Sequence, residues 1–76
     1  MRTFDLRDTI ISFSLLEISN AFKDMKQEEV MEINCKDPES RLALFKILPA
    51  SLYEIIRDEK IEGANPWLRI RLRKKV

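Results

Sequence analysis

The sequence predicts an α+β two-layer sandwich with the order β-α-β-α-β-β, in which a four-stranded mixed sheet carries both helices on one face. Apolar and polar residues alternate in several short segments with the period of a strand, and two longer segments space apolar residues as a helix does. Alternation also implies that the second face of the sheet meets solvent, because a sheet buried on both faces would be apolar throughout. The 76 residues form one domain, 1–76, since two domains would each be too small to hold a core.

The first strand and first helix are predicted from short-range patterns. Residues 2–6 alternate, with Phe4 and Leu6 on one side, which predicts a short strand. Ser14 and Glu17 have the spacing of a capping box, so we expect a helix over about residues 13–26. Its apolar stripe consists of Leu15, Ile18, Ala21, Phe22 and Met25.

The second strand and second helix follow after a polar connector. Residues 30–36 alternate and place Cys35 on one face with Met31 and Ile33. Asp37 suits the N-cap and Pro38 the first helical position, so we expect a helix over 37–48. Its apolar set is wider than one stripe requires: Leu42, Ala43, Leu44, Phe45, Ile47 and Leu48.

The final part of the chain predicts a hairpin. Residues 51–57 are expected to form the third strand and residues 58–66, which include Gly63, a polar turn. Residues 67–73 alternate most clearly of all. Leu68, Ile70 and Leu72 face one way, and Arg69, Arg71 and Arg73 face the other.

Composition excludes several classes of function. Lys and Arg total 14 and Asp and Glu total 13, so the net charge of +1 gives no general attraction to nucleic acid or to an anionic membrane. The absence of histidine excludes Ser-His-Asp triads and zinc sites that contain histidine. A single cysteine, Cys35, excludes an internal disulfide, and a single glycine, Gly63, excludes a glycine-rich phosphate loop. We therefore expect no metal, no cofactor, no membrane partner and a reducing, cytoplasmic location.

Three short motifs accompany this element order. Asp5 and Arg7 form an Asp-x-Arg motif after the first predicted strand, residues 36–38 (KDP) begin the second helix, and Gly63 precedes LRIR at 68–71. In these features the chain resembles the TusA/SirA-like family of small sulfur-carrier proteins over nearly its whole length. That family has the motif D-x-R-G-L-x-C-P-x-P before its first helix. This chain departs from the motif at five positions, with Asp8 for Gly, Thr9 for Leu, Ile11 for Cys, and Ser12 and Ser14 for the two Pro.

The resemblance implies the fold of a sulfur carrier without its reactive group. In the family, the motif cysteine lies at a helix N-terminus, where it carries a persulfide to a protein partner. Ile11 cannot hold a sulfur atom. We therefore expect a non-catalytic protein-interaction or regulatory module, whose partner is a component of a sulfur-relay system.

Two alternative functions remain open at this point. Cys35 could carry the persulfide instead, although its strand face favours a place in the core. A basic stripe on the last strand could bind RNA or DNA, or an acidic protein surface. It consists of Arg69, Arg71 and Arg73, with Lys74 and Lys75 behind them and Trp67 beside them. Pairing of these arginines with carboxylates such as Glu32 or Glu54 is the more favoured interpretation, so nucleic acid is the less favoured partner class.

Other residues have both a structural and a functional interpretation. Leu44 and Phe45 are expected not to point squarely into the core together. This suggests either a partner-binding or self-association patch on the second helix, or a helix that is buried deeply between the sheet and the segment around Ala50. Ser12 and Ser14 could bind an anion at the first helix, or Ser14 could only cap it. Asp5 and Arg7 could shape the loop before that helix or form a surface ion pair.

Overall fold

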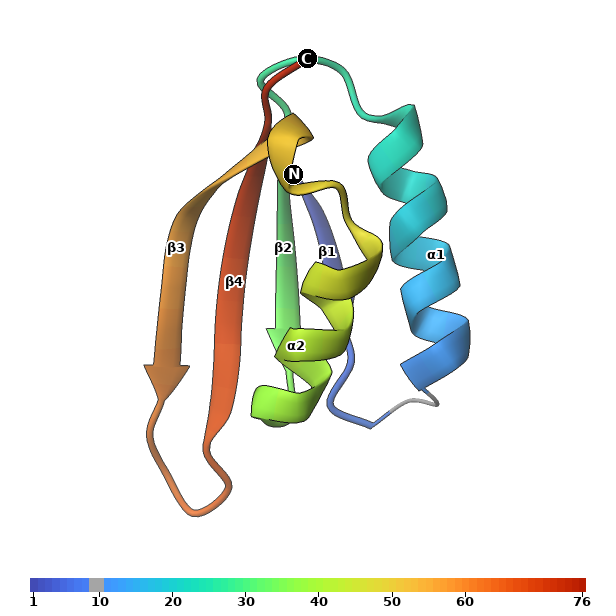
Figure 1. The fold of residues 1–76 in the computed structure, drawn as a ribbon. Coiled ribbons are helices and arrows are strands. Elements are labelled where there is room, and N and C mark those ends of the chain that lie inside the picture. Colours follow the sequence, from blue (N-terminus) through green and yellow to red (C-terminus); the bar gives the residue numbers. More distant parts are fainter. Residues whose placement is uncertain (9–10) are drawn as a thin grey trace.

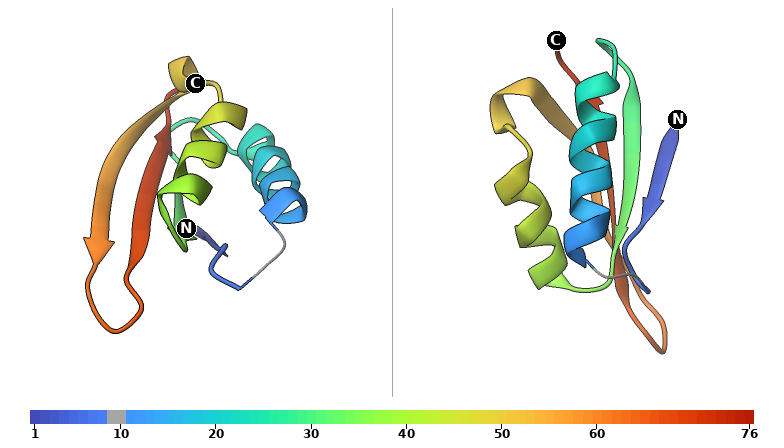
Figure 2. Two further views of the ribbon diagram at one scale, coloured as in Figure 1. Left: turned by 60° about the horizontal axis from the view of Figure 1, so that its bottom comes forward. Right: turned by 90° about the vertical axis from the view of Figure 1, so that its right-hand side faces the viewer.

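The predicted order and architecture are confirmed. A computed structural model describes residues 1–8 and 11–76, except for the side chain of Ile11. Over these residues the chain forms two layers, a mixed four-stranded sheet and a pair of α-helices that cover one of its faces (Figures 1 and 2). The elements are β1 (Arg2–Asp5), α1 (Ile11–Asp24), β2 (Val30–Cys35), α2 (Pro38–Ile47), a 3-10 turn η1 (Ala50–Leu52), β3 (Tyr53–Ile61) and β4 (Trp67–Lys74).

The strands lie in the order β1-β2-β4-β3. β1 and β2 are parallel, with Phe4 opposite Ile33, and are joined through α1. β4 runs antiparallel to both of its neighbours, β2 and β3. The carboxyl ends of β1 and β2 therefore lie at the same end of the sheet, where the helices α1 and α2 begin (Figure 1).

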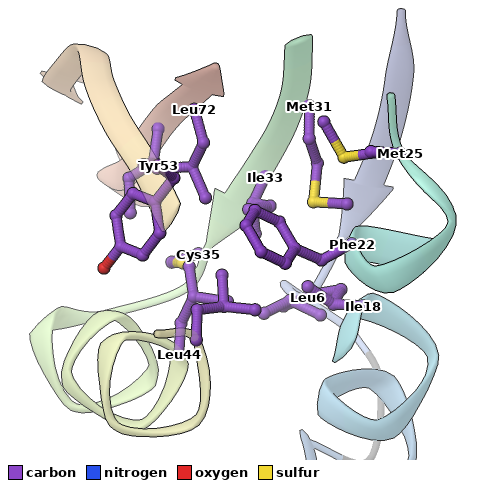
Figure 3. Close-up of a cluster of buried hydrophobic side chains, with 12 residues drawn as sticks. Leu6, Ile18, Phe22, Met25, Met31, Ile33, Cys35, Leu44, Tyr53 and Leu72 are labelled. Carbon is purple, nitrogen blue, oxygen red and sulfur yellow. The ribbon is translucent and has the colours of Figure 1, made fainter. Parts of the chain in front are cut away.

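The core fills the space between the sheet and the helices (Figure 3). Met31, Ile33 and Cys35 project from β2 toward the helices, as the alternation predicted. Burial of these side chains is the main source of stability in a domain of this size. The buried residues are Leu6, Ile18, Phe22, Met25, Met31, Ile33, Cys35, Leu44, Leu48, Tyr53, Ile70 and Leu72.

β3 differs from the prediction in its position. It covers Tyr53–Ile61, so the polar residues expected in a turn continue the strand. Ionic partners explain this, because Glu59 lies opposite Arg69 and bonds to it, and Asp58 accepts from Arg41 of α2. The predicted strand 51–57 was therefore wrong at both ends.

The first helix begins earlier than the capping box implied. Because α1 begins at Ile11, Ser14 lies within its first turn and cannot be the N-cap residue. The prediction of a Ser14–Glu17 capping box was therefore wrong. By contrast, Asp37 caps α2 as expected, since its carboxylate accepts a hydrogen bond of 2.9 Å from the Ser40 backbone amide.

Lys74 is buried, whereas its charge suggested a position at the solvent-exposed basic stripe. It lies on the helix-facing side of β4 with 8% of its surface exposed, so it does not belong to the basic stripe. Its Nζ donates to the carbonyl oxygens of Phe22 at 2.7 Å and Lys23 at 3.3 Å, in the last turn of α1. The ammonium thus closes the negative end of that helix.

Candidate functional site

A hollow lies at the end of the sheet where β1 and β2 finish. It consists of two adjoining depressions of about 590 and about 450 Å³, which share Arg7, Asp8 and Lys36. We call this combined depression the strand-end hollow. Its other lining residues are Leu6, Asp37, Glu39, Ser40, Ala43, Asn65, Pro66 and Trp67. The carboxyl ends of parallel strands are the usual place for a binding site in open α/β sheets.

Arg7 forms one wall of the strand-end hollow and is held in place by Asp5. The Asp5 carboxylate accepts from the Arg7 backbone amide at 3.0 Å and from its Nε and Nη2 at 2.9 and 2.7 Å. The guanidinium also lies over the Trp67 ring, 4.4 Å from its centroid. The hydrogen bonds from Arg7 hold the pKa of Asp5 below its usual value. Asp5 and Arg7 therefore shape the loop after β1, and they join it to the start of β4.

The opposite wall comes from the start of α2. Asp37 accepts from both the backbone amide and the hydroxyl of Ser40, each at 2.9 Å, and these bonds hold its pKa below the usual value. Lys36 lies beside it with an exposed side chain. This wall is thus a capped helix end with an exposed ammonium at its rim.

The structure brings only part of the predicted motif loop to the hollow. Arg7 lines the hollow and is bonded to Asp5. Ser12 and Ser14, which stand at the two proline positions of the family motif before the helix, instead lie in the first turn of α1 and are not among the residues that line the hollow. Thr9 and the side chain of Ile11 lie outside the described residues, and the expectations for them stay predictions. Sequence reasoning missed Lys36 and Asp8 as residues of this hollow. Lys36 directly follows the end of β2, which was the available signal, whereas Asp8 lies three residues beyond the end of β1.

Cys35 lies in the core and not at the hollow. Its exposed surface is 0%, and Figure 3 shows it beside Leu44 between β2 and α2. Burial raises the pKa of its thiol to about 11, a change that the nearby Arg41 only partly opposes. At neutral pH the sulfur is therefore protonated and covered, which is the condition of a packing residue and not of a nucleophile.

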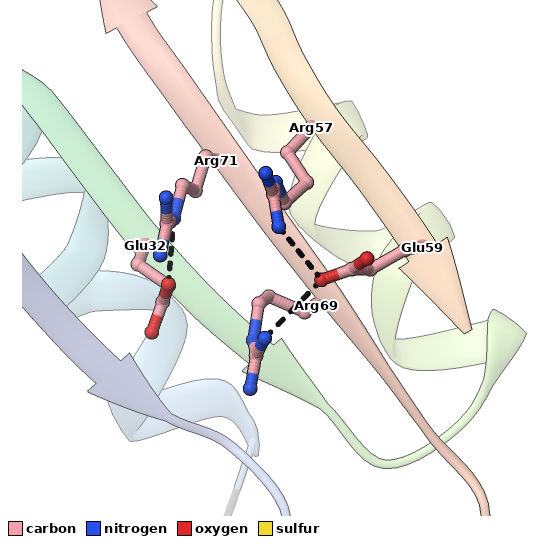
Figure 4. Close-up of polar contacts among 5 residues, drawn as sticks. All are labelled: Glu32, Arg57, Glu59, Arg69 and Arg71. Atoms are coloured by element: carbon pink, nitrogen blue, oxygen red, sulfur yellow. Dashed lines mark hydrogen bonds and ion pairs between the residues drawn. The ribbon is translucent and has the colours of Figure 1, made fainter. Parts of the chain in front are cut away.

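The arginines of β4 lie on the open face of the sheet and are paired there (Figure 4). Arg71 Nε donates to Glu32 at 2.8 Å, and Arg69 contacts Glu59 at 3.2 Å. The further pairs are Arg73 with Glu54, Arg73 with Glu28 at 3.7 Å, and Arg57 with Glu59 at 3.5 Å. The carboxylates balance the guanidiniums, so this face lacks the excess positive charge that binds phosphates.

Leu44 and Phe45 do not form the predicted surface patch together. Leu44 has 0% exposure, so naming it as a partner-binding residue was wrong. Phe45 is half-buried, stacks on Tyr53 at 6.2 Å and carries the Arg41 guanidinium at 4.8 Å. Leu44 therefore belongs to the core, and Phe45 packs against the core from its edge.

Within residues 1–8 and 11–76, no group of three or more acidic or cysteine side chains is placed to hold a metal ion. No helix in the same part of the chain is both long and apolar enough to cross a membrane. No model of a known protein family and no curated protein sequence matches the chain.

Proposed function

We propose that this protein is a non-catalytic interaction or regulatory module with a TusA/SirA-like fold, and that it docks a component of a sulfur-relay system through the strand-end hollow. The element order and the Asp5–Arg7 loop support the resemblance that underlies this proposal. A cytoplasmic location accompanies it, because the single cysteine is kept as a buried free thiol.

The buried state of Cys35 is the observation that carries the proposal. It is the only cysteine in the sequence, so a persulfide on this chain would have to form on it. A donor persulfide must meet the attacking sulfur directly, and attack requires the thiolate. The Cys35 thiol is covered, so a donor persulfide cannot reach it, and its pKa of about 11 keeps it protonated at neutral pH. A role without sulfur transfer therefore fits the chain better than that of a carrier.

The strand-end hollow has the character of a docking surface for a protein. Arg7 and Lys36 contribute positive charge, while Asp8 and Glu39 contribute negative charge at the same rim. The Trp67 ring adds an aromatic surface that is fixed by Arg7 and by Arg69 at 5.1 Å. Mixed charge around an aromatic anchor is typical of protein interfaces.

The absence of sulfur transfer is tested by mass spectrometry. The protein is incubated with a cysteine desulfurase and L-cysteine, and its intact mass is compared with that of Cys35→Ala. We expect no gain of 32 Da in either protein, while sulfide release with a small-molecule thiol shows that the desulfurase is active. Stoichiometric addition of sulfur to the unchanged chain alone would overturn the proposal.

The partner is tested by affinity capture with matched baits. Lys36→Glu reverses an exposed charge at the hollow, and Lys26→Glu reverses an exposed charge next to the C-terminal end of α1. We expect a sulfur-relay protein to be retained by the unchanged chain and by Lys26→Glu but lost with Lys36→Glu. Equal retention by all three baits would place the interface elsewhere, and retention of no sulfur-relay component would contradict the proposed pathway.

A further inference from the structure

The two edges of the sheet differ in length and in chemistry. β1 forms one edge with four residues, whereas β3 forms the other with nine. No other strand of the described chain pairs with the outer side of β3, so its backbone amides and carbonyls there are free to pair with another strand. Such an edge is a template for the addition of a strand.

The middle of β3 presents apolar side chains at this edge. A bulge lies between Ile55 and Arg57, where Ile56 is the extra residue. Ile55 and Ile56 are 44% and 42% exposed, although both are large and aliphatic. Ile55 lies opposite Leu72 on the helix-facing side, while Glu54 and Arg57 lie opposite Arg73 and Arg71 on the open face. Within one chain Glu54 already bonds to Arg73, and Arg57 contacts Glu59. The edge segment thus offers two exposed isoleucines flanked by two side chains of opposite charge.

We propose that β3 pairs antiparallel with β3 of a second copy of this chain, so that the two sheets join edge to edge in a two-fold dimer. In an antiparallel self-pairing centred between Ile55 and Ile56, each Ile55 faces Ile56 of the second copy. Each Glu54 then faces Arg57 of the second copy. Because the bulge leaves Glu54 and Arg57 on the same face of the sheet, the opposed charges of this register lie side by side on that face, which is the arrangement that stabilises cross-strand neighbours.

Other registers are less favourable. Moving one strand by one residue in one direction places Glu54 of the open face opposite Asp58, which lies on the helix-facing side, so the opposed side chains no longer share a face. Moving it by two residues places Glu54 opposite Glu59. A one-residue shift in the other direction places Glu54 opposite Ile56, so both charged contacts are lost. Directly opposed like charges destabilise a strand pair. The segment therefore specifies both its partner, another copy of itself, and the register of pairing.

A charge-swap experiment tests the dimer. Sedimentation velocity of the unchanged protein should show reversible dimers between about 10 µM and about 1 mM, as expected of a small interface. Glu54→Arg and Arg57→Glu each place like charges across both symmetric contacts, and each should weaken association about tenfold or more. An equal mixture of the two variants restores both contacts and should associate as the unchanged protein does.

The controls separate this interface from loss of folding. Thr3→Lys adds a charge to the other edge strand and should leave association unchanged. Circular dichroism spectra of the charge variants should match that of the unchanged protein. A protein that stays monomeric at about 1 mM, or folded variants whose mixture associates no better than either variant alone, would overturn the proposal.

Discussion

Lys74→Met should lower the free energy of unfolding by about 2 kcal/mol, because it removes the cation that closes the C-terminal end of α1. The side chain is 8% exposed, and its Nζ donates to the carbonyl oxygens of Phe22 and Lys23 at 2.7 and 3.3 Å. The ammonium also lies 4.9 Å from the centroid of the Phe22 ring. Methionine keeps most of the aliphatic length, so the change isolates the charge and its hydrogen bonds.

The magnitude follows from the separate contributions. A hydrogen bond from a charged donor contributes about 1.5–3 kcal/mol, and a cation at a helix C-terminus adds about 0.3–1 kcal/mol. The variant no longer carries the desolvation cost of a buried ammonium, and this gain offsets part of the lost stability. The Phe22 carbonyl also keeps its bond from the Met25 amide at 3.2 Å, which limits the loss further. The net value of about 2 kcal/mol corresponds to a fall in Tm of roughly 10 °C for a domain of this length.

Thermal and urea unfolding followed by circular dichroism measure this effect. The matched control is Lys75→Met, since Lys75 is the exposed neighbour of Lys74 and should change Tm by no more than about 2 °C. A Lys74→Met protein with a Tm equal to or above that of the unchanged protein would refute the reasoning. It would show that burying the ammonium costs more than its two carbonyl contacts return.

Further predictions concern the core, the helix cap and the thiol. Leu44→Ala should destabilise the protein by about 3 kcal/mol in urea unfolding, whereas Leu42→Ala, at a site 56% exposed, should change stability by less than about 0.5 kcal/mol. Asp37→Asn should be less stable than the unchanged chain near neutral pH. Because the Ser40 bonds lower the pKa of the Asp37 carboxyl in the folded state, this difference should shrink as pH falls below about 4, and a constant difference would contradict the cap. Burial raises the pKa of Cys35 from 9.0 to about 11, so folding stability should fall as pH rises through this window, and Cys35→Ala should lack that part of the decline.

The strands that alternate could be predicted closely from the sequence. The prediction of residues 2–6 agrees with β1 to within one residue, and those of 30–36 and 67–73 agree equally well with β2 and β4. Each of these strands has one face in the core and one in solvent, so the side-chain pattern reports the backbone directly.

β3 could not be predicted as well, because its second half extends beyond the apolar core. Asp58, Glu59 and Lys60 show no apolar alternation, and they form a strand only because β4 and Arg41 supply hydrogen bonds and opposite charges. Those partners are distant in sequence and are visible only once the sheet is assembled. The ion pairs of Glu32 and Glu54 with β4 are present as expected, since those carboxylates lie on alternating strand positions.

The candidate site was predicted only in part. The Asp-x-Arg motif indicated the loop that contains Arg7, and the structure places this loop against Trp67, which no local pattern specifies. Lys74 shows the opposite problem. Its charge suggested the solvated stripe, but strand alternation places it on the face toward α1, where helix-end carbonyls compensate for its burial. Alternation was therefore a better guide than charge at that position.

The rate at which Cys35 reacts with a thiol reagent, in the folded protein and in urea, tests the central claim most directly. The rise in pKa from 9.0 to about 11 alone lowers the thiolate fraction about a hundredfold at neutral pH, and the 0% exposure slows the reaction further. We predict labelling in the folded state at least about a hundredfold slower than in urea, with one equivalent of reagent consumed once the chain unfolds. Equal rates in the two states would show an accessible thiolate and would contradict the assignment of a module that does not carry sulfur.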